Sequence, residues 1–132
     1  MDPKEVYDYV LEQGYEYFTG VPDSLLKEFQ NSISKSKHKN VVATHESQAV
    51  AMAFGAELAG KKACVYMQNS GLGNAINPLT SLCIPCGIEP LLVIGHRHTL
   101  HQHEIMGRID EKLLKLIGYK NYIIVNGDNN VK

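Results

Sequence analysis

The segment ACVYMQNSGLGNAINPLTSL, residues 63–82, passes from a strand pattern to a helix pattern across a turn rich in glycine and asparagine. Residues 63–68 are mostly apolar and predict a buried strand, whereas residues 74–82 predict a helix. Residues 69–73 are typical of the turn that joins them. A strand that leads directly into a helix is the repeating unit of a parallel α/β sheet.

The same alternation extends over the rest of the chain. Further strands are expected at residues 15–19, 40–44, 90–95 and 122–126. Further helices are expected at residues 3–13 (with Asp2 as the cap), 24–33, 46–59 and 110–117, and the expected stops are Gly14, Gly60 and Gly118. Because apolar strands alternate with helices, the sequence predicts one α/β domain with an open parallel sheet and helices on both faces.

The composition restricts the classes of function. A chain of 132 residues with 44% hydrophobic and 20% charged residues suits one globular domain. No segment approaches the roughly 18 apolar residues of a membrane span, and the N-terminus lacks the apolar region of a signal peptide. A net charge of −1 gives no general attraction to nucleic acid. Three cysteines cannot all pair within the chain, which favours a reducing, cytoplasmic location.

Polar or glycine-rich sequence follows four of the predicted strands. These four segments are residues 20–23, 45–46, 68–71 and 96–98. Ligands of open parallel sheets bind beyond the carboxyl ends of the strands. We therefore expect a ligand site where these four segments meet.

Glu46 and the turn at residues 69–73 each allow two interpretations. A carboxylate in the first turn of a helix can simply interact with the helix dipole, which contributes about 0.3–1 kcal/mol. A carboxylate between two layers can instead share a proton with a ligand nitrogen. The turn is either a tight connection or a cradle for phosphate, although it lacks the GxGxxG and P-loop patterns.

Three segments together resemble the thiamine diphosphate-dependent 2-oxoacid decarboxylases. They are FTGVPDSLL at residues 18–26, THE at residues 44–46 with the alanine-rich helix that follows, and YMQNSGLGNAINPLTSL at residues 66–82. The resemblance extends over nearly the whole chain and points to the phosphonopyruvate and sulfopyruvate decarboxylase branch. It corresponds to the pyrimidine-binding domain of that family, which implies that residues 1–132 form one such domain.

The resemblance implies a role for Glu46. In such enzymes a glutamate at this position hydrogen-bonds N1′ of the aminopyrimidine and promotes the imino tautomer, whose nitrogen deprotonates thiazolium C2. The 2-oxoacid then loses CO2 and leaves as an aldehyde. The cofactor site would be lined by Gly20, Val21, Pro22, Glu46, Asn69, Ser70, Gly71, Leu72 and Gly73. Asp23 is a candidate proton relay, although a helix cap explains it equally well.

The segment HRHTLHQHE, residues 96–104, holds four of the six histidines. Histidine relays protons near neutral pH, and arginine pairs with phosphonate or sulfonate groups. Because related decarboxylases place histidines or an arginine in this loop, His98 and His103 are catalytic candidates and Arg97 a substrate-binding one. Asn74 is a further candidate for the substrate. The alternative is a solvated loop.

Two other motifs suggest less. The single CxxC at residues 83–86 follows a predicted helix and is expected to be structural, with no metal site. The segment GDNN at residues 127–130 is interpreted as a polar end of the chain after the last strand.

The diphosphate and Mg²⁺ site of the family lies on a separate domain, and this chain has no convincing set of oxygen ligands for Mg²⁺. We therefore expect thiamine diphosphate and Mg²⁺ to be held with a partner, a diphosphate-binding β subunit in a dimer or tetramer of such pairs, or by another domain of a longer enzyme. The expected function is decarboxylation of phosphonopyruvate or sulfopyruvate. The alternatives are a non-catalytic binding or regulatory module of the same fold and, more weakly, a metal protein that uses cysteine and histidine.

Overall fold

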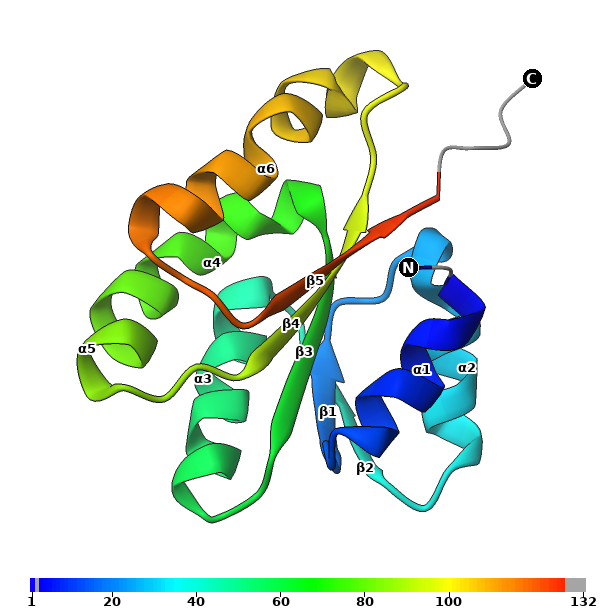
Figure 1. Ribbon diagram of the computed structural model, residues 1–132, viewed down its shortest axis with the longest axis vertical. Helices are drawn as coiled ribbons and strands as arrows, with labels where there is room; N and C mark the ends of the chain where they lie inside the picture. The colour runs from blue at the N-terminus through cyan, green and yellow to red at the C-terminus, as the bar shows by residue number, and fades with distance from the viewer. Residues whose placement is uncertain (2, 128–132) are drawn as a thin grey trace.

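The computed structural model describes Met1 and residues 3–127, and its centre is one sheet of five parallel strands (Figure 1). The strands are β1 (Tyr17–Gly20), β2 (Lys39–Val42), β3 (Ala63–Gln68), β4 (Leu91–His96) and β5 (Tyr122–Asn126). Their spatial order is β2-β1-β3-β4-β5, and every neighbouring pair is parallel. The predicted open parallel sheet is confirmed.

Helices cover both faces of this sheet (Figure 1). One face carries α1 (Pro3–Glu12) and α2 (Lys27–Lys35), and the other carries α3 (Glu46–Leu58), α4 (Leu72–Pro78), α5 (Ile84–Cys86) and α6 (Glu104–Ile117). The expected helix ends at Gly14, Gly60 and Gly118 are confirmed, since each adopts a positive φ of 79–89°. None of the described helices has the length and apolarity that crossing a bilayer requires.

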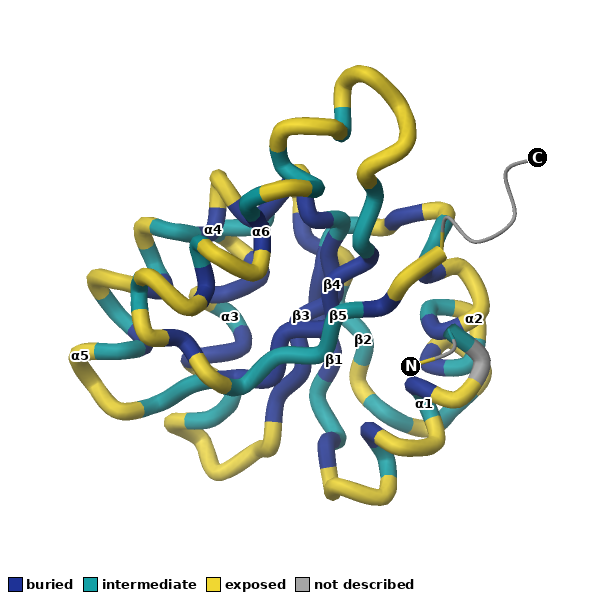
Figure 2. The backbone as a smooth tube through the Cα atoms, turned by 45° about the horizontal axis from the view of Figure 1, so that its top comes forward, coloured by how far each residue is buried: buried dark blue, intermediate teal, exposed yellow. Residues whose placement is uncertain are grey.

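Two hydrophobic cores lie on the two faces of the sheet. Alternation along β3 separates them, because Cys64 and Tyr66 belong to the core under α1 and α2 whereas Val65 and Met67 belong to the other. Figure 2 shows the resulting buried centre, with exposed residues concentrated in the outer turns and helix surfaces.

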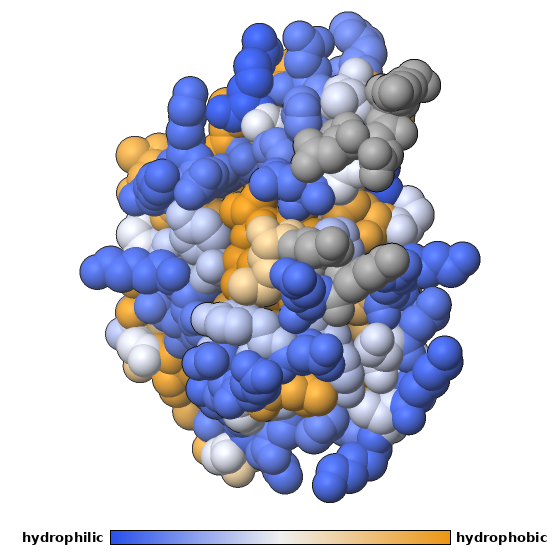
Figure 3. Space-filling view, turned by 45° about the vertical axis from the view of Figure 1, so that its right-hand side comes forward, coloured by the Kyte–Doolittle hydropathy of each residue, from blue (hydrophilic) through white to orange (hydrophobic). Residues whose placement is uncertain are grey.

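β5 is an edge strand, and its Ile123 and Ile124 are only half-buried. In the view of Figure 3, hydrophobic side chains gather near the centre of a mostly hydrophilic face.

The helical segment after β3 is longer than the sequence pattern predicts. A 3-10 turn at Asn69–Gly71 leads into α4 at Leu72, and a π-helical turn at Leu79–Cys83 continues into α5. The CxxC motif therefore lies inside the end of this helical segment and not after it. Pro78 explains the irregularity, because proline has no N–H for the regular helical hydrogen bond.

α6 begins at Glu104, six residues before the predicted start at Asp110. A 3-10 turn at His101–His103 precedes it, so the second half of the expected histidine loop is helical. The early turns of α6 include Gly107, an unfavourable helix residue, which weakens the pattern in the sequence. The predicted cap Asp2 and the residues of the GDNN segment after Gly127 lie outside the described residues.

Candidate functional site

The four polar segments predicted to meet do lie at the same edge of the sheet. Because all five strands are parallel, their carboxyl ends share one edge (Figure 1). Residues 21–23 follow β1, residues 45–46 follow β2, residues 69–71 follow β3 and residues 97–98 follow β4, while Gly20 is the last residue of β1. The edge therefore collects side chains that are up to 78 residues apart in the sequence.

Glu46, the first residue of α3, packs against the turn that follows β3. It is half-buried, and its Oε2 accepts a hydrogen bond of 3.1 Å from Asn74 Nδ2. A Cβ atom at Gly71 would lie 2.6 Å from both Cγ and Cδ of Glu46, so glycine is needed to leave the carboxyl group its place. Glu46 is thus held between α3 and the 69–73 turn and is not fully exposed to bulk solvent.

A second contact ties the starts of α3 and α4 together. The hydroxyl group of Ser47 donates a hydrogen bond to the backbone carbonyl of Asn74. This carbonyl precedes Pro78 by four residues, and proline cannot supply the N–H that would otherwise bind it. His45 caps the same end of α3, since its Nδ1 accepts a hydrogen bond of 3.2 Å from Ser47 N.

Asp23 forms an ion pair across the site. Its Oδ1 lies 3.4 Å from Arg97 Nη2, and the same nitrogen donates a 2.5 Å hydrogen bond to Ser24 Oγ. Asp23 is only 8% exposed, and a Cβ atom at Gly95 of β4 would lie 2.7 Å from its Oδ2. Asp23 does occupy the N-cap position of the 3-10 turn Ser24–Leu26, but its side chain makes no capping hydrogen bond, so capping does not account for its buried carboxylate.

The residues between β1 and Asp23 line the same edge. Gly20 ends β1 beside Tyr66, Val21 is half-buried and Pro22 is exposed. Burial raises the pKa of the Tyr66 phenol, which donates a 3.0 Å hydrogen bond to Asn40 Oδ1. Tyr66 is therefore a neutral part of the scaffold beneath Gly20.

Two of the predicted histidines reach the site from the segment after β4. His103 Nδ1 lies 3.1 Å from Gln68 Nε2, at the end of β3. His98 is exposed, and its ring centroid is 5.0 Å from that of His96. The backbone here runs close over α6, because a Cβ atom at Gly107 would lie 2.8 Å from Arg97 O.

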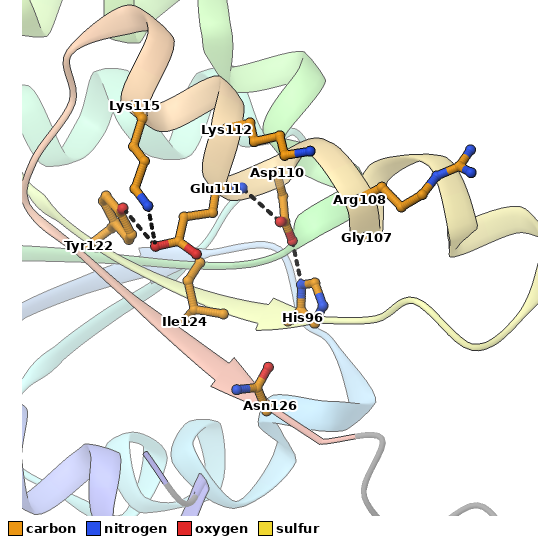
Figure 4. A pocket seen from close by; sticks show the side chains of 10 residues that line it. All are labelled: His96, Gly107, Arg108, Asp110, Glu111, Lys112, Lys115, Tyr122, Ile124 and Asn126. Carbon is orange, nitrogen blue, oxygen red and sulfur yellow. Dashed lines mark hydrogen bonds and ion pairs between the residues drawn. The ribbon is translucent and has the colours of Figure 1, made fainter.

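Asp110 of α6 joins two of these strand ends, although it was not among the predicted site residues. Its Oδ2 accepts hydrogen bonds from Asn69 Nδ2 at 2.9 Å and from His96 Nδ1 at 2.5 Å. Asn69 Nδ2 also donates a 2.9 Å hydrogen bond to Arg97 O. Figure 4 shows the contact with His96 beside a cavity of about 500 Å³ between α6 and β5.

Several buried polar atoms at this edge have no partner. Among the described residues, the four buried side-chain atoms without a hydrogen bond are Thr19 Oγ1, Asp23 Oδ2, Asn69 Oδ1 and Arg97 Nε. Asp23, Asn69 and Arg97 all lie at the carboxyl ends of the strands, and Thr19 immediately precedes Gly20. A buried polar atom without a partner costs free energy, so its presence in a cluster is typical of a ligand site.

The comparisons with known proteins identify the family of this chain. Residues 4–114 match the family model described as thiamine pyrophosphate enzyme, N-terminal TPP binding domain. The chain belongs to this family. The resemblance inferred from the three sequence segments is confirmed.

Named relatives of this family member include both predicted decarboxylases. The chain is 38% identical over 122 residues to the sulfopyruvate decarboxylase subunit alpha of Methanocaldococcus jannaschii, which covers 89% of this chain and 72% of that protein. It is 40% identical over 109 residues to the phosphonopyruvate decarboxylase of Streptomyces viridochromogenes, which covers 78% of this chain and 28% of that protein.

Solved structures have the same fold. A Mycobacterium smegmatis protein described as a thiamin diphosphate-dependent enzyme superposes with a TM-score of 0.56 at 25% identity, over 80% of this chain and 20% of that one. A 2-oxoglutarate:ferredoxin oxidoreductase from Magnetococcus marinus gives a TM-score of 0.62 at 17% identity, over 96% and 28% of the two chains, and shows the fold alone.

The residues present fit the pyrimidine end of the family's cofactor. Glu46 supplies a half-buried carboxyl group, and Gly71 leaves space for it. The buried oxygen atoms Asp23 Oδ2 and Asn69 Oδ1, which have no hydrogen-bond partner, can accept hydrogen bonds from ligand N–H groups. The residues do not fit a metal site, since no group of three or more His, Cys, Asp or Glu side chains converges within the described part of the chain.

Not every predicted residue presents its side chain to this edge. Leu72 is fully buried in the hydrophobic core under α3, so only its backbone can face a ligand. Ser70 and Gly73 are exposed. The individual binding and catalytic roles assigned to these residues stay predictions.

Sequence reasoning placed Gln68 and His96 in the polar segments of the expected site without giving either a role, and it missed Asp110. One signal for Asp110 was available, because it shares a helical face with the partly or fully buried Met106 and Leu114. A helix predicted to start earlier would have placed Asp110 on its apolar face. A carboxylate on such a face needs a buried hydrogen-bond partner, which would have marked Asp110 as a candidate.

Proposed function

We propose that this chain is the pyrimidine-binding subunit or domain of a thiamine diphosphate-dependent decarboxylase that converts sulfopyruvate or phosphonopyruvate to the corresponding aldehyde and CO2. The observation that carries the proposal is the position of Glu46 against Gly71 and Asn74, at the carboxyl edge of a domain of this family. The named relatives support the reaction class and both substrates.

Glu46 would hold the proton that the aminopyrimidine ring nitrogen exchanges. Asn74 Nδ2 donates a hydrogen bond to Oε2, and Oε1 lies against Gly71, where a Cβ atom would collide with it. A partly dry carboxyl group shares a proton with a ring nitrogen more strongly than a solvated one. Bound thiamine diphosphate would supply the electron sink for the carbanion that loss of CO2 leaves.

Asp23, His98 and His103 would move protons near the reacting carbon. Asp23 is buried and charge-paired with Arg97, and His103 is oriented by Gln68, so both side chains already have fixed directions. Arg97 would attract the anionic substrate, although its Nη2 is already bound to Asp23 and Ser24. Its buried and unpartnered Nε is the atom that still needs an acceptor.

The diphosphate end of the cofactor and Mg²⁺ would be held by a partner, which we propose to be a β subunit carrying the diphosphate-binding domain. The relatives named alpha subunits support such a partner. The site would then lie at a subunit interface, in a hetero-oligomer built from such pairs. The three free cysteines support a cytoplasmic location.

The test is Glu46→Gln in the chain reconstituted with its diphosphate-binding partner, with sulfopyruvate and phosphonopyruvate as substrates. The amide keeps the shape but cannot exchange the proton, so we expect kcat to fall at least about a hundredfold while the fold is unchanged. Glu104→Gln is the matched control, because Glu104 also begins a helix but is exposed at the start of α6. Near-normal turnover of Glu46→Gln would refute the proposed role.

A further inference from the structure

Asp110 is a buried carboxylate with three hydrogen-bond donors around it. It is 3% exposed on α6. Its Oδ1 accepts from Glu111 N at 2.7 Å, and its Oδ2 accepts from both Asn69 Nδ2 and His96 Nδ1. Figure 4 shows His96 and the Glu111 backbone converging on this carboxylate from different sides. A buried charge is retained at low cost only where such donors surround it.

The donors fix the orientation of the Asn69 amide. Its NH2 group gives one hydrogen bond to Asp110 and another to the backbone carbonyl of Arg97, and neither of these partners can donate. The Asn69 amide therefore cannot rotate by half a turn without facing oxygen toward two acceptors. Its Oδ1 must point away from them, and this atom is buried with no partner.

The same carboxylate fixes the tautomer of His96. A carboxylate accepts hydrogen bonds, so the proton of this 2.5 Å contact lies on His96 Nδ1. The His96 ring is tilted by 33° against the ring of His98. Asp110 thus contacts the turn at residues 69–73 through Asn69, and the end of β4 through His96.

We propose that Asp110 is a positioning residue for the thiamine diphosphate site: it holds the Asn69 amide so that Oδ1 is presented to the ligand, and it locks the His96 ring beneath His98. This inference rests on the proposed function for the identity of the ligand. The positions of Asn69 and His96 themselves do not depend on the ligand, so they can be measured separately.

The test is Asp110→Asn. The substitution keeps the shape but places an NH2 group against donors, because the three described hydrogen-bond partners of the Asp110 oxygens all donate. Glu111→Gln is the matched control: Glu111 is the next residue, and among the described residues its carboxylate binds Lys115 and the Tyr122 hydroxyl but no site residue (Figure 4). Leu114→Ala on the same helix is a second control, since it removes a fully buried core side chain that makes no hydrogen bond to Asn69 or His96.

The first readout is NMR of the full chain with ¹⁵N-labelled histidine. We expect the wild-type chain to show a slowly exchanging Nδ1–H proton of His96, assigned by its loss in His96→Leu. Asp110→Asn should lose this signal, whereas Glu111→Gln and Leu114→Ala should keep it. Persistence of the signal in Asp110→Asn would overturn the inference.

The second readout is kcat of the reconstituted decarboxylase, measured well below the unfolding midpoint. We expect Asp110→Asn to lower kcat by about ten- to a hundredfold, because a misplaced site group has that effect. Leu114→Ala at similar stability should retain kcat. If Asp110→Asn does not fold, His96→Leu replaces it and should lower kcat in the same direction. Wild-type kcat in the variant used would refute the inference.

A wild-type complex that binds thiamine diphosphate but decarboxylates neither substrate would refute the proposed function and not the positioning role. In that case the NMR signal and the affinity for thiamine diphosphate with Mg²⁺ decide the inference. Asp110→Asn should weaken this affinity, and equal affinity in the two proteins would overturn the positioning role.

Discussion

Replacing Gly71 by alanine is expected to displace the Glu46 carboxyl group without straining the backbone. Gly71 has φ −75° and ψ −13°, which any residue adopts easily. The new Cβ atom would lie 2.6 Å from Cγ and Cδ of Glu46. The side chain of Glu46 is the part that must move, because Gly71 itself is fixed in a 3-10 turn against the buried Leu72.

The size of the effect follows from these distances. Non-bonded carbon atoms pack at about 3.5–4.0 Å, so the carboxyl group must retreat by about 1 Å. A displacement of about 1 Å in a catalytic group lowers the rate by up to about a hundredfold. This rate change corresponds to about 2.7 kcal/mol of lost transition-state stabilisation.

The assay is kcat of the chain reconstituted with its diphosphate-binding partner, together with the thermal midpoint of the isolated chain. Gly55→Ala is the control: it lies in the same helix as Glu46, and a Cβ atom there would have no heavy atom within 4 Å. We expect Gly71→Ala to lose most of its turnover and Gly55→Ala to keep it. A Gly71→Ala enzyme within twofold of the wild-type kcat would show that the position of Glu46 does not limit the reaction.

Three other predictions concern charge, pH and the partner. Arg97→Ala should raise KM for the anionic substrates about tenfold and, because it leaves Asp23 unpaired, should lower the free energy of unfolding by about 1–3 kcal/mol. Steady-state kinetics would measure KM and denaturant unfolding the stability, with Arg108→Ala as the control. Burial raises the pKa of the Cys83 thiol from 9.0 to about 11, so the stability that this group contributes is complete below pH 9 and is lost as the pH rises toward 11. Unfolding curves across this range should therefore be less pH-dependent for Cys83→Ala than for the exposed-site control Cys86→Ala, and equal slopes would contradict the assignment. Calorimetry of the chain alone should detect little affinity for thiamine diphosphate with Mg²⁺, and tight binding would refute the need for a partner.

The sheet was predictable because its strands carry strong local signals. β3 and β5 have the predicted bounds, and β4 differs from its prediction by one residue at each end. The position of Glu46 beside the 69–73 turn also follows from sequence, since both segments come directly after parallel strands. The family was identified from three sequence segments and their order along the chain, which the amino-acid composition does not contain.

The connections within the site were not predictable, because they depend on pairs that are far apart in the chain. Asp110 and Asn69 are 41 residues apart, and Arg97 and Asp23 are 74 apart. Neither pair has a periodicity that sequence inspection can detect. The early start of α6 was missed because Gly107 interrupts the helix pattern. Asp110 therefore lies within α6 and not at its start, and there it contacts Asn69 after β3 and His96 at the end of β4.

Arg97 contributes to the site through two separate atoms, and this separation changes how its variants should be interpreted. Its side chain holds Asp23, whereas its backbone carbonyl helps to hold Asn69. Substitution of the side chain therefore removes only the first of these contacts. Both residues also carry an unpartnered buried acceptor, Asp23 Oδ2 and Asn69 Oδ1. Because the side chain of Arg97 holds Asp23 and its backbone carbonyl holds Asn69, the segment after β4 is a scaffold for the site as well as a source of titrating side chains.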